Sequence, residues 1–309
     1  MKIPAIPVAL GTATYGTSVP EHAAFDLLGA FAGLGGTVLD TANNYAFWHA
    51  DGVGGDSETV LGNWLQTQDR TAFTVITKVG SQPSRDDKDV EHLEGLSSAA
   101  VRRAVDRSLA RLRTDCLDVL LAHHDDLDTP LLDTWRAFTQ LVEQGTVKRV
   151  GISNYHPERI IELTRLIGEH GLAPISAVQL KYSVLPPLPG VDFGKLVVLD
   201  NNLRQILSAS VPQATVYGYA PLLGGLFERD PFGDGKDHPW PAAYDSPQNR
   251  QQVEEIRQAA ADADVSASAW VLQSVVQQGI IPVTSTRSLA RLESNLDLVR
   301  NLSWPAPLP

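Results

Sequence analysis

The stretch VKRVGISNYHPERIIELTRLIGE, residues 147–169, contains the unit from which the whole fold can be predicted. Its apolar, β-rich run Arg149–Ile152 predicts a short strand. A turn-forming pair, Ser153 and Asn154, follows this run. Pro157 suits the first turn of a helix, which we expect over Pro157–Glu169. The stretch therefore predicts a strand, a polar turn and a helix, in that order.

The same order recurs along the 309 residues. Apolar runs predict eight strands, at Val8–Leu10, Thr37–Leu39, Phe73–Thr77, Leu117–Ala122, Arg149–Ile152, Ala177–Leu180, Thr215–Tyr219 and Ile280–Val283. Helices are expected at His22–Leu34, Ser57–Gln66, Ser98–Leu112, Leu131–Gln144, Pro157–Glu169, Lys195–Ala209, Ser246–Gln278 in one or two pieces, and Leu289–Asn295.

Continuous apolar strands indicate burial on both faces, as in a parallel sheet, and crossovers of this length between parallel strands are helices. A (β/α)8 TIM barrel that forms a single domain over residues 1–309 is the simplest arrangement, and a doubly wound open sheet is the alternative. The long connections Gly80–Leu96 and Leu222–Pro247 are expected to form functional loops at the C-terminal rim.

Composition narrows the class of protein. Lys plus Arg number 25 and Asp plus Glu number 36, which gives a net charge of −11 and argues against a nucleic-acid or anionic-membrane partner. Cys116 is the single cysteine, so no internal disulfide can form and a reducing compartment is expected. The sequence shows no apolar signal core and no run of about 18 apolar residues. We therefore expect a cytoplasmic protein.

Polar side chains follow most of the predicted strands, where a barrel of this kind carries its active site. Each has an ordinary structural explanation, such as helix capping or turn formation. A barrel, however, would bring them together at one rim: Asp40, Tyr45, Lys78, His123, His124, Ser153, Asn154, Gln179, Tyr219, Ser285, Thr286 and Arg287.

These residue types suit proton transfer at a carbonyl group. A free tyrosine has a pKa of about 10, and a neighbouring ammonium lowers it. We therefore expect Lys78 to lower the pKa of Tyr45, Asp40 to hold Lys78, and His123 to orient the carbonyl oxygen. No side chain donates a hydride, so a nicotinamide is expected, held by Ser153, Asn154 and Gln179 with Tyr219 stacked on its ring.

The ordered segments resemble the aldo-keto reductase family over nearly the whole chain. They run from LGTATYG (10–16) through LDTANNY (39–45), GDSETVLG (55–62), ITKVG (76–80), LDVLLAHH (117–124), VKRVGISNY (147–155), AVQLKYSVL (177–185) and YGYAPLLGGLF (217–227) to IIPVTSTRSLARLESN (280–295).

The resemblance implies a role for each segment. Asp40, Tyr45, Lys78 and His123 would be catalytic, and Ser153, Asn154 and Gln179 would bind the nicotinamide. The remaining cofactor-binding residues would be Tyr219, Leu222, Gly224, Gly225, Ser285, Thr286, Arg287, Arg291 and Asn295. We also expect Tyr15, Phe47, Trp48 and His124 to line the substrate pocket. The family spacing, five residues after Asp118, selects His123 over His124 as the active-site histidine.

The chain also departs from the family pattern. An insert, Phe47–Gly54, follows Tyr45 and should shape the substrate mouth. Val283 stands where the family often has a lysine beside the proline, so phosphate contacts would come from Ser285, Thr286, Arg287 or Arg291. Because arginine suits bidentate phosphate binding, the cofactor is expected to be NADPH rather than NADH.

The sequence thus predicts an NADP(H)-dependent oxidoreductase, an aldo-keto reductase or alcohol dehydrogenase. It would reduce an aldehyde or ketone, or oxidise the corresponding alcohol, such as a sugar or polyol. A cofactor-binding regulatory or redox-sensing module with little turnover is the alternative. The run HHDD, residues 123–126, also suggests a metal-dependent hydrolase, but adjacent strand residues point to opposite faces, so no metal is expected. Apart from its small-molecule substrate, the protein is expected to be a monomer or weak homo-oligomer.

Overall fold

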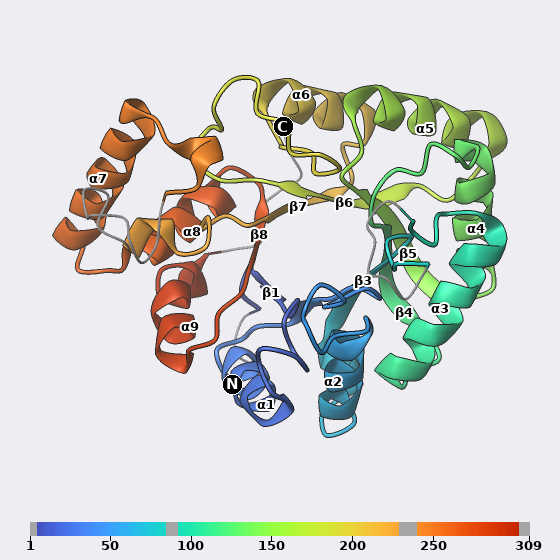
Figure 1. Ribbon diagram of the computed structural model, residues 1–309, viewed down its shortest axis with the longest axis horizontal. Helices are drawn as coiled ribbons and strands as arrows, with labels where there is room; N and C mark the ends of the chain where they lie inside the picture. The colour runs from blue at the N-terminus through green and yellow to red at the C-terminus, as the bar shows by residue number, and fades with distance from the viewer. Residues whose placement is uncertain (1–4, 85–91, 229–239, 303–309) are drawn as a thin grey trace.

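Eight parallel strands form a closed barrel in chain order, with β1 hydrogen-bonded to both β2 and β8 (Figure 1). The structure, a computed structural model, describes residues 5–84, 92–228 and 240–302. The strands are β1 (Ala9–Gly11), β2 (Val38–Asp40), β3 (Thr74–Val79), β4 (Leu117–Ala122), β5 (Val147–Ser153), β6 (Ile175–Lys181), β7 (Thr215–Tyr219) and β8 (Ile281–Thr284). The predicted TIM barrel is confirmed, and the open-sheet alternative is wrong because the β1–β8 pairing closes the sheet.

Helices surround the barrel on its outer side (Figure 1). They are α1 (Glu21–Gly33), α2 (Asp56–Leu65), α3 (Ser98–Leu112), α4 (Leu131–Glu143), α5 (Pro157–His170), α6 (Asn201–Ser210), α7 (Pro247–Asp262), α8 (Ala267–Gln277) and α9 (Leu289–Leu296). Short 3-10 turns are η1 (Arg70–Ala72), η2 (Leu226–Glu228), η3 (Ala242–Tyr244) and η4 (Val299–Asn301). No helix among the described residues is long and apolar enough to cross a membrane.

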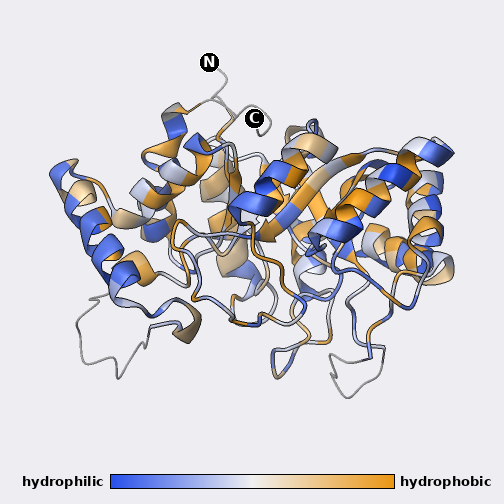
Figure 2. Cartoon of the chain, turned by 90° about the horizontal axis from the view of Figure 1, so that it is seen from above, coloured by the Kyte–Doolittle hydropathy of each residue, from blue (hydrophilic) through white to orange (hydrophobic). Residues whose placement is uncertain are grey.

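Side-chain alternation along the strands divides the core into two parts. One set of residues, including Val38, Ile76, Leu121 and Ala177, fills the inside of the barrel. The other set packs outward against the helices, for example Leu39 and Leu120. The helices contain both hydrophilic and hydrophobic residues, while the strands between them are largely hydrophobic (Figure 2). This alternation also decides which strand-end residues face the barrel axis.

One predicted helix begins later than expected. The sequence predicts a helix over Lys195–Ala209, but α6 starts at Asn201. Asp200 caps it by accepting a hydrogen bond from the Leu203 amide at 2.7 Å. The preceding residues instead extend the sheet, because Val197 and Leu199 form backbone hydrogen bonds with Lys181 of β6. The hydrogen bonds of this short ladder outweigh the helical pattern in the sequence.

The predicted segment Ser246–Gln278 forms two helices, α7 and α8. Asp264 lies between them with a positive φ of 54°, which interrupts the helix, and Ser266 caps α8 by accepting from the Ala269 amide at 3.1 Å. The two long connections follow β3 and β7, whose C-terminal ends share one rim. Parts of both, residues 85–91 and 229–239, lie outside the described residues.

Candidate active site

Strand parity directs three predicted residues into the barrel mouth. Asp40, Lys78 and His123 each lie two residues beyond a side chain that faces the barrel interior, namely Val38, Ile76 and Leu121. Because side chains alternate along a strand, all three point to the same central space. Asp40 and Lys78 are fully buried, and His123 is 8% exposed.

The Lys78 ammonium is held by three acceptors. Its Nζ donates to Asp40 Oδ2 at 2.9 Å, to the Thr41 carbonyl at 2.7 Å and to the Tyr45 hydroxyl at 3.1 Å. An ammonium has three donors, so this set uses them all. The other Asp40 oxygen accepts from Gln179 Nε2 at 2.7 Å. The predicted contacts of Lys78 with both Asp40 and Tyr45 are therefore present, and Gln179 joins them from across the barrel.

The pKa of Tyr45 differs from the expectation. We expected Lys78 to bring it below its usual value, but burial raises the Tyr45 pKa more than the Lys78 ammonium lowers it, and Asp40 raises it further. For Lys78, burial acts to lower the pKa, but the charges of Asp40 and Tyr45 raise it above the usual value. At neutral pH the structure therefore holds a charged lysine beside a protonated tyrosine.

The two adjacent histidines occupy different environments. The His123 ring meets the Tyr45 ring edge-on at a centroid distance of 5.8 Å, and it stacks on His124 at 4.8 Å. Burial, followed by the charges of His124 and Lys78, holds the pKa of His123 well below its usual value, so its ring is neutral at neutral pH. His124 turns to Ser81, with 2.7 Å between Nδ1 and Oγ, and burial lowers its pKa to about 4.

Asn154 connects the predicted nicotinamide-binding residues. Its Nδ2 donates to the His123 carbonyl at 3.1 Å and to Ser153 Oγ at 3.0 Å. Its Oδ1 accepts from the Tyr219 hydroxyl at 2.7 Å and from the Val197 amide at 3.2 Å. Asn154 thus orients the Tyr219 ring, and Ser153 Oγ accepts one of the hydrogen bonds that the Asn154 amide donates.

The predicted phosphate-binding residues lie mostly at the surface. Ser285, Arg287 and Arg291 are exposed, and neither arginine has an ion pair within the described part of the chain. Thr286 bonds within its own turn, and Asn295 is 9% exposed in α9. In the loop after β7, Leu222 is buried, whereas Gly224 and Gly225 have φ values of 70° and 84°, a region that favours glycine.

The insert after Tyr45 places an aromatic wall beside the site. Trp48 is 51% exposed and meets the Tyr45 ring edge-on at 5.6 Å and the Phe47 ring at 5.4 Å. Phe47 is 8% exposed. Tyr15, also predicted for the substrate pocket, is only 1% exposed and belongs to the main hydrophobic core, so it offers no open surface.

Sequence reasoning missed a residue that joins two segments of the site. Glu94 Oε1 accepts from Asn43 Nδ2 at 2.6 Å and from the Gly80 amide at 2.8 Å. It thereby ties the loop that carries Tyr45 to the end of β3, two residues beyond Lys78. Glu94 lies in a long connection without periodicity, so no local pattern could have identified it.

The side chains of the HHDD run, residues 123–126, do not converge on a common position that could hold a metal ion. Asp125 pairs with Arg159, at 2.6 Å and 3.0 Å, while Asp126 accepts from the Leu96 amide at 2.7 Å. Within residues 5–84, 92–228 and 240–302, no group of three or more His, Cys, Asp or Glu side chains comes together as a metal site.

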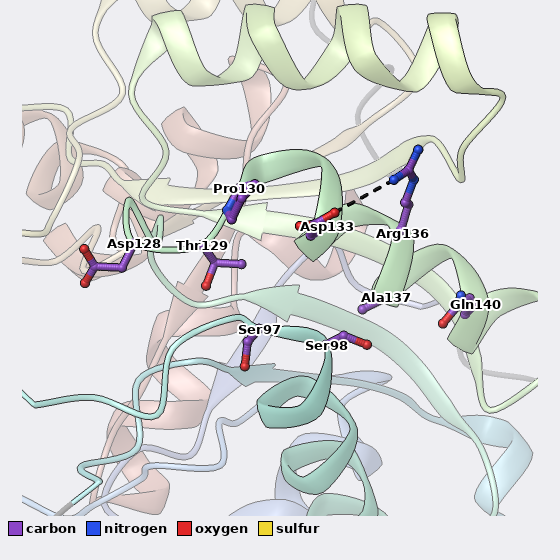
Figure 3. A pocket seen from close by; sticks show the side chains of 9 residues that line it. All are labelled: Ser97, Ser98, Asp128, Thr129, Pro130, Asp133, Arg136, Ala137 and Gln140. Atoms are coloured by element: carbon purple, nitrogen blue, oxygen red, sulfur yellow. Dashed lines mark ion pairs between the residues drawn. The ribbon is translucent and has the colours of Figure 1, made fainter.

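A pocket of about 480 Å³ lies apart from the predicted residues, between the N-terminal ends of α3 and α4 (Figure 3). Its lining includes Ser97, Asp128 and Arg136, and Arg136 forms an exposed 3.8 Å ion pair with Asp133. None of the predicted site residues lines it. The candidate active site is therefore the barrel mouth, where the predicted catalytic side chains lie together, and not this pocket.

Comparisons with known proteins give a consistent result. The sequence model of the Aldo/keto reductase family matches residues 7–303. The uncharacterized oxidoreductase YrpG of Bacillus subtilis (strain 168) is 29% identical over 180 residues, 58% of this chain and 54% of YrpG, so the match spans about half of that protein. Norsolorinic acid reductase of Aspergillus flavus is 24% identical over 306 residues, 94% of this chain and 73% of that protein.

A solved structure shares the fold. It is that of a candidate 2,5-diketo-D-gluconic acid reductase B, which superposes with a TM-score of 0.68 and 21% identity, covering 96% of this chain and 83% of that one. At this identity the likeness concerns the fold alone.

Proposed function

This chain belongs to the aldo/keto reductase family, and from that premise we propose that it reduces the carbonyl group of an aldehyde or ketone, with NADPH as cofactor and Tyr45 as proton donor. The observation that carries the proposal is the Lys78 ammonium bonded to both Asp40 and Tyr45 in the barrel mouth. We propose that the whole chain acts as one barrel domain in this reaction.

The residues at the rim fit the chemistry of a phosphorylated nicotinamide cofactor. Arg287 and Arg291 offer exposed guanidinium groups for a phosphate. Gly224 and Gly225, in the loop that follows the Tyr219 strand, have positive φ values that favour glycine, and without side chains their backbone can approach a ligand closely. Ser153 offers a hydroxyl proton and Tyr219 a partly exposed ring for the nicotinamide end. When bound, the cofactor supplies the hydride for the carbonyl carbon.

The protein's own residues would manage the proton. A carbonyl oxygen between Tyr45 and His123 would accept hydrogen bonds from the Tyr45 hydroxyl and from the neutral His123 ring. As negative charge develops on that oxygen, Tyr45 donates its proton. The resulting tyrosinate would be stabilised by the Lys78 ammonium, whose Nζ lies 3.1 Å from the Tyr45 oxygen. Because the Tyr45 pKa is raised, the site at neutral pH is prepared for reduction rather than for oxidation.

The test compares wild type with Tyr45→Phe in NADPH oxidation assays over a panel of aldehydes and ketones. Loss of the proton donor should lower turnover by about 10²- to 10⁴-fold. Tyr155→Phe is a matched control, because the buried Tyr155 hydroxyl has no hydrogen-bond partner among the described residues. Its activity should equal that of wild type.

Fluorescence titration with NADPH and, separately, NADH completes the test. Tyr45→Phe should bind NADPH as wild type does, and NADPH should bind more tightly than NADH. Full turnover by Tyr45→Phe would refute the proton-donor role. Tight NADPH binding by a wild-type protein that reduces no carbonyl would instead support a regulatory or redox-sensing module.

A further inference from the structure

A second lysine, Lys181, faces the barrel mouth. Gln179 of β6 points inward, where it bonds Asp40, and alternation directs Lys181, two residues later, to the same side. Lys181 is also the register partner of Tyr219 on β7. Its Nζ lies 5.9 Å from the Tyr219 ring centroid and 5.6 Å from that of Phe193. Lys181 therefore stands one layer above Gln179, toward the entrance.

The charge of Lys181 is not matched by a carboxylate. Lys78 pairs with Asp40, but within the described residues Lys181 forms no ion pair, and its ammonium lies near two aromatic rings. The side chain is partly buried, and burial lowers its pKa. A partly desolvated ammonium is costly without a counter-charge, and aromatic faces offset only part of that cost. In a chain of net charge −11, this is a local excess of positive charge.

Tyr219 relates Lys181 to the reacting groups, because the Lys181 Nζ lies 5.9 Å from the centroid of its ring. After burial, the charge of Tyr45 is the next largest cause of the raised pKa of Tyr219, so these two hydroxyls lie within electrostatic reach of each other. Tyr219 is therefore close to Lys181 and within electrostatic reach of Tyr45. A ligand whose carbonyl lies at Tyr45 would therefore direct a substituent toward positive charge.

We propose that Lys181 binds an anionic group of the substrate, so that the preferred substrates are aldehydes or ketones that carry a carboxylate. This inference rests on the proposed carbonyl reduction and names the class of substrate. The apolar body of such a molecule would pack against Trp48. Lys181 could instead bind a phosphate of the cofactor, which is also an oxyanion. The experiment below distinguishes this phosphate from a substrate carboxylate.

The experiment uses pairs of substrates that differ only in charge: 4-carboxybenzaldehyde with its methyl ester, and 4-oxobutanoate with its methyl ester. Wild type should reduce the carboxylates with the higher kcat/KM. Lys181→Met, which keeps the length of the side chain, should lower kcat/KM for the carboxylates by about 10- to 100-fold, as expected for a lost charge-assisted hydrogen bond. Its kcat/KM for the esters should stay within about twofold of wild type.

Two further variants serve as controls. Lys181→Arg keeps the charge and should retain most of the preference for carboxylates. Lys148→Met removes a lysine that is 62% exposed and paired with Asp118 near the start of β4, so it should leave both substrates unaffected.

The outcomes separate the inference from the function on which it rests. Reduction of esters and carboxylates with equal kcat/KM by wild type would overturn the inference alone. So would a weaker NADPH affinity in Lys181→Met with an unchanged carboxylate preference, because the oxyanion would then belong to the cofactor. Failure of wild type to reduce any of the four compounds or any other carbonyl would overturn the proposed function, and the inference with it.

Discussion

Replacing Asp40 by Asn should destabilise the barrel strongly. The Asp40 and Lys78 side chains are 4% and 0% exposed, and the Asp40 oxygens accept from Lys78 Nζ and from Gln179 Nε2. The side-chain amide of Asn has one acceptor oxygen, and its second group is an NH2 that can only donate. If its oxygen faces Lys78, its NH2 group meets the Gln179 donor, and the reverse orientation presents a donor to the ammonium. The buried charge of Lys78 is left uncompensated in either case.

Breaking a buried ion pair from one side costs about 3–5 kcal/mol. We therefore expect Asp40→Asn to lower the free energy of unfolding by about that amount. The measurement is equilibrium unfolding in urea at neutral pH, followed by tryptophan fluorescence and by circular dichroism. Coincidence of the two transitions would support two-state analysis. Asp133→Asn is the matched control: its partner Arg136 is half exposed, so the expected loss is below about 1 kcal/mol.

A double-mutant cycle isolates the pair. Lys78→Met alone leaves a buried carboxylate and should also be costly, but Asp40→Asn combined with Lys78→Met removes both charges. The double variant should therefore lose clearly less than the two single losses together, with a coupling of about 2 kcal/mol or more. A loss for Asp40→Asn no larger than that of Asp133→Asn, or strictly additive losses, would refute the reasoning.

Two further predictions concern pH. Because burial keeps the pKa of Tyr45 above its usual value, kcat for carbonyl reduction should stay level from about pH 6 to about pH 9. The rate of alcohol oxidation should rise over the same range, because oxidation needs the deprotonated tyrosine. A fall in the reduction rate with an apparent pKa near 7 would contradict this prediction. For His124 the folded pKa is about 4 against the ordinary 6.5, so between these values the unfolded chain binds a proton that the folded chain does not, and stability falls as the pH decreases. The comparison is with His124→Asn, which keeps a polar partner for Ser81. Between about pH 7 and pH 5, the free energy of unfolding in urea should fall by up to about 2 kcal/mol more for wild type than for this variant. Equal decreases would argue against a neutral buried His124.

Local pattern was sufficient to predict the order of elements and the polar residues at the strand ends. Alternation along a strand has a period of two, but the apolar runs continue on both faces, so only the closed barrel shows that Asp40, Lys78 and Gln179 face its interior. The surroundings of Lys181 are likewise visible only in the folded chain, where the rings of Tyr219 and Phe193 lie near its ammonium and no ion pair to it is formed among the described residues.

The tertiary structure decided what depends on distance and burial. The direction of the Tyr45 pKa shift depends on desolvation, which acts against the Lys78 charge. No local sequence pattern shows how deeply a hydroxyl group is buried. The late start of α6 depends on backbone hydrogen bonds to β6, and the role of Glu94 depends on contacts with residues 14 and 51 positions away. The sequence determined which polar residues stand at the strand ends, because the order of apolar runs and turns is a local property. Their protonation and partners were determined only by the folded chain, because these depend on atoms brought together from distant segments.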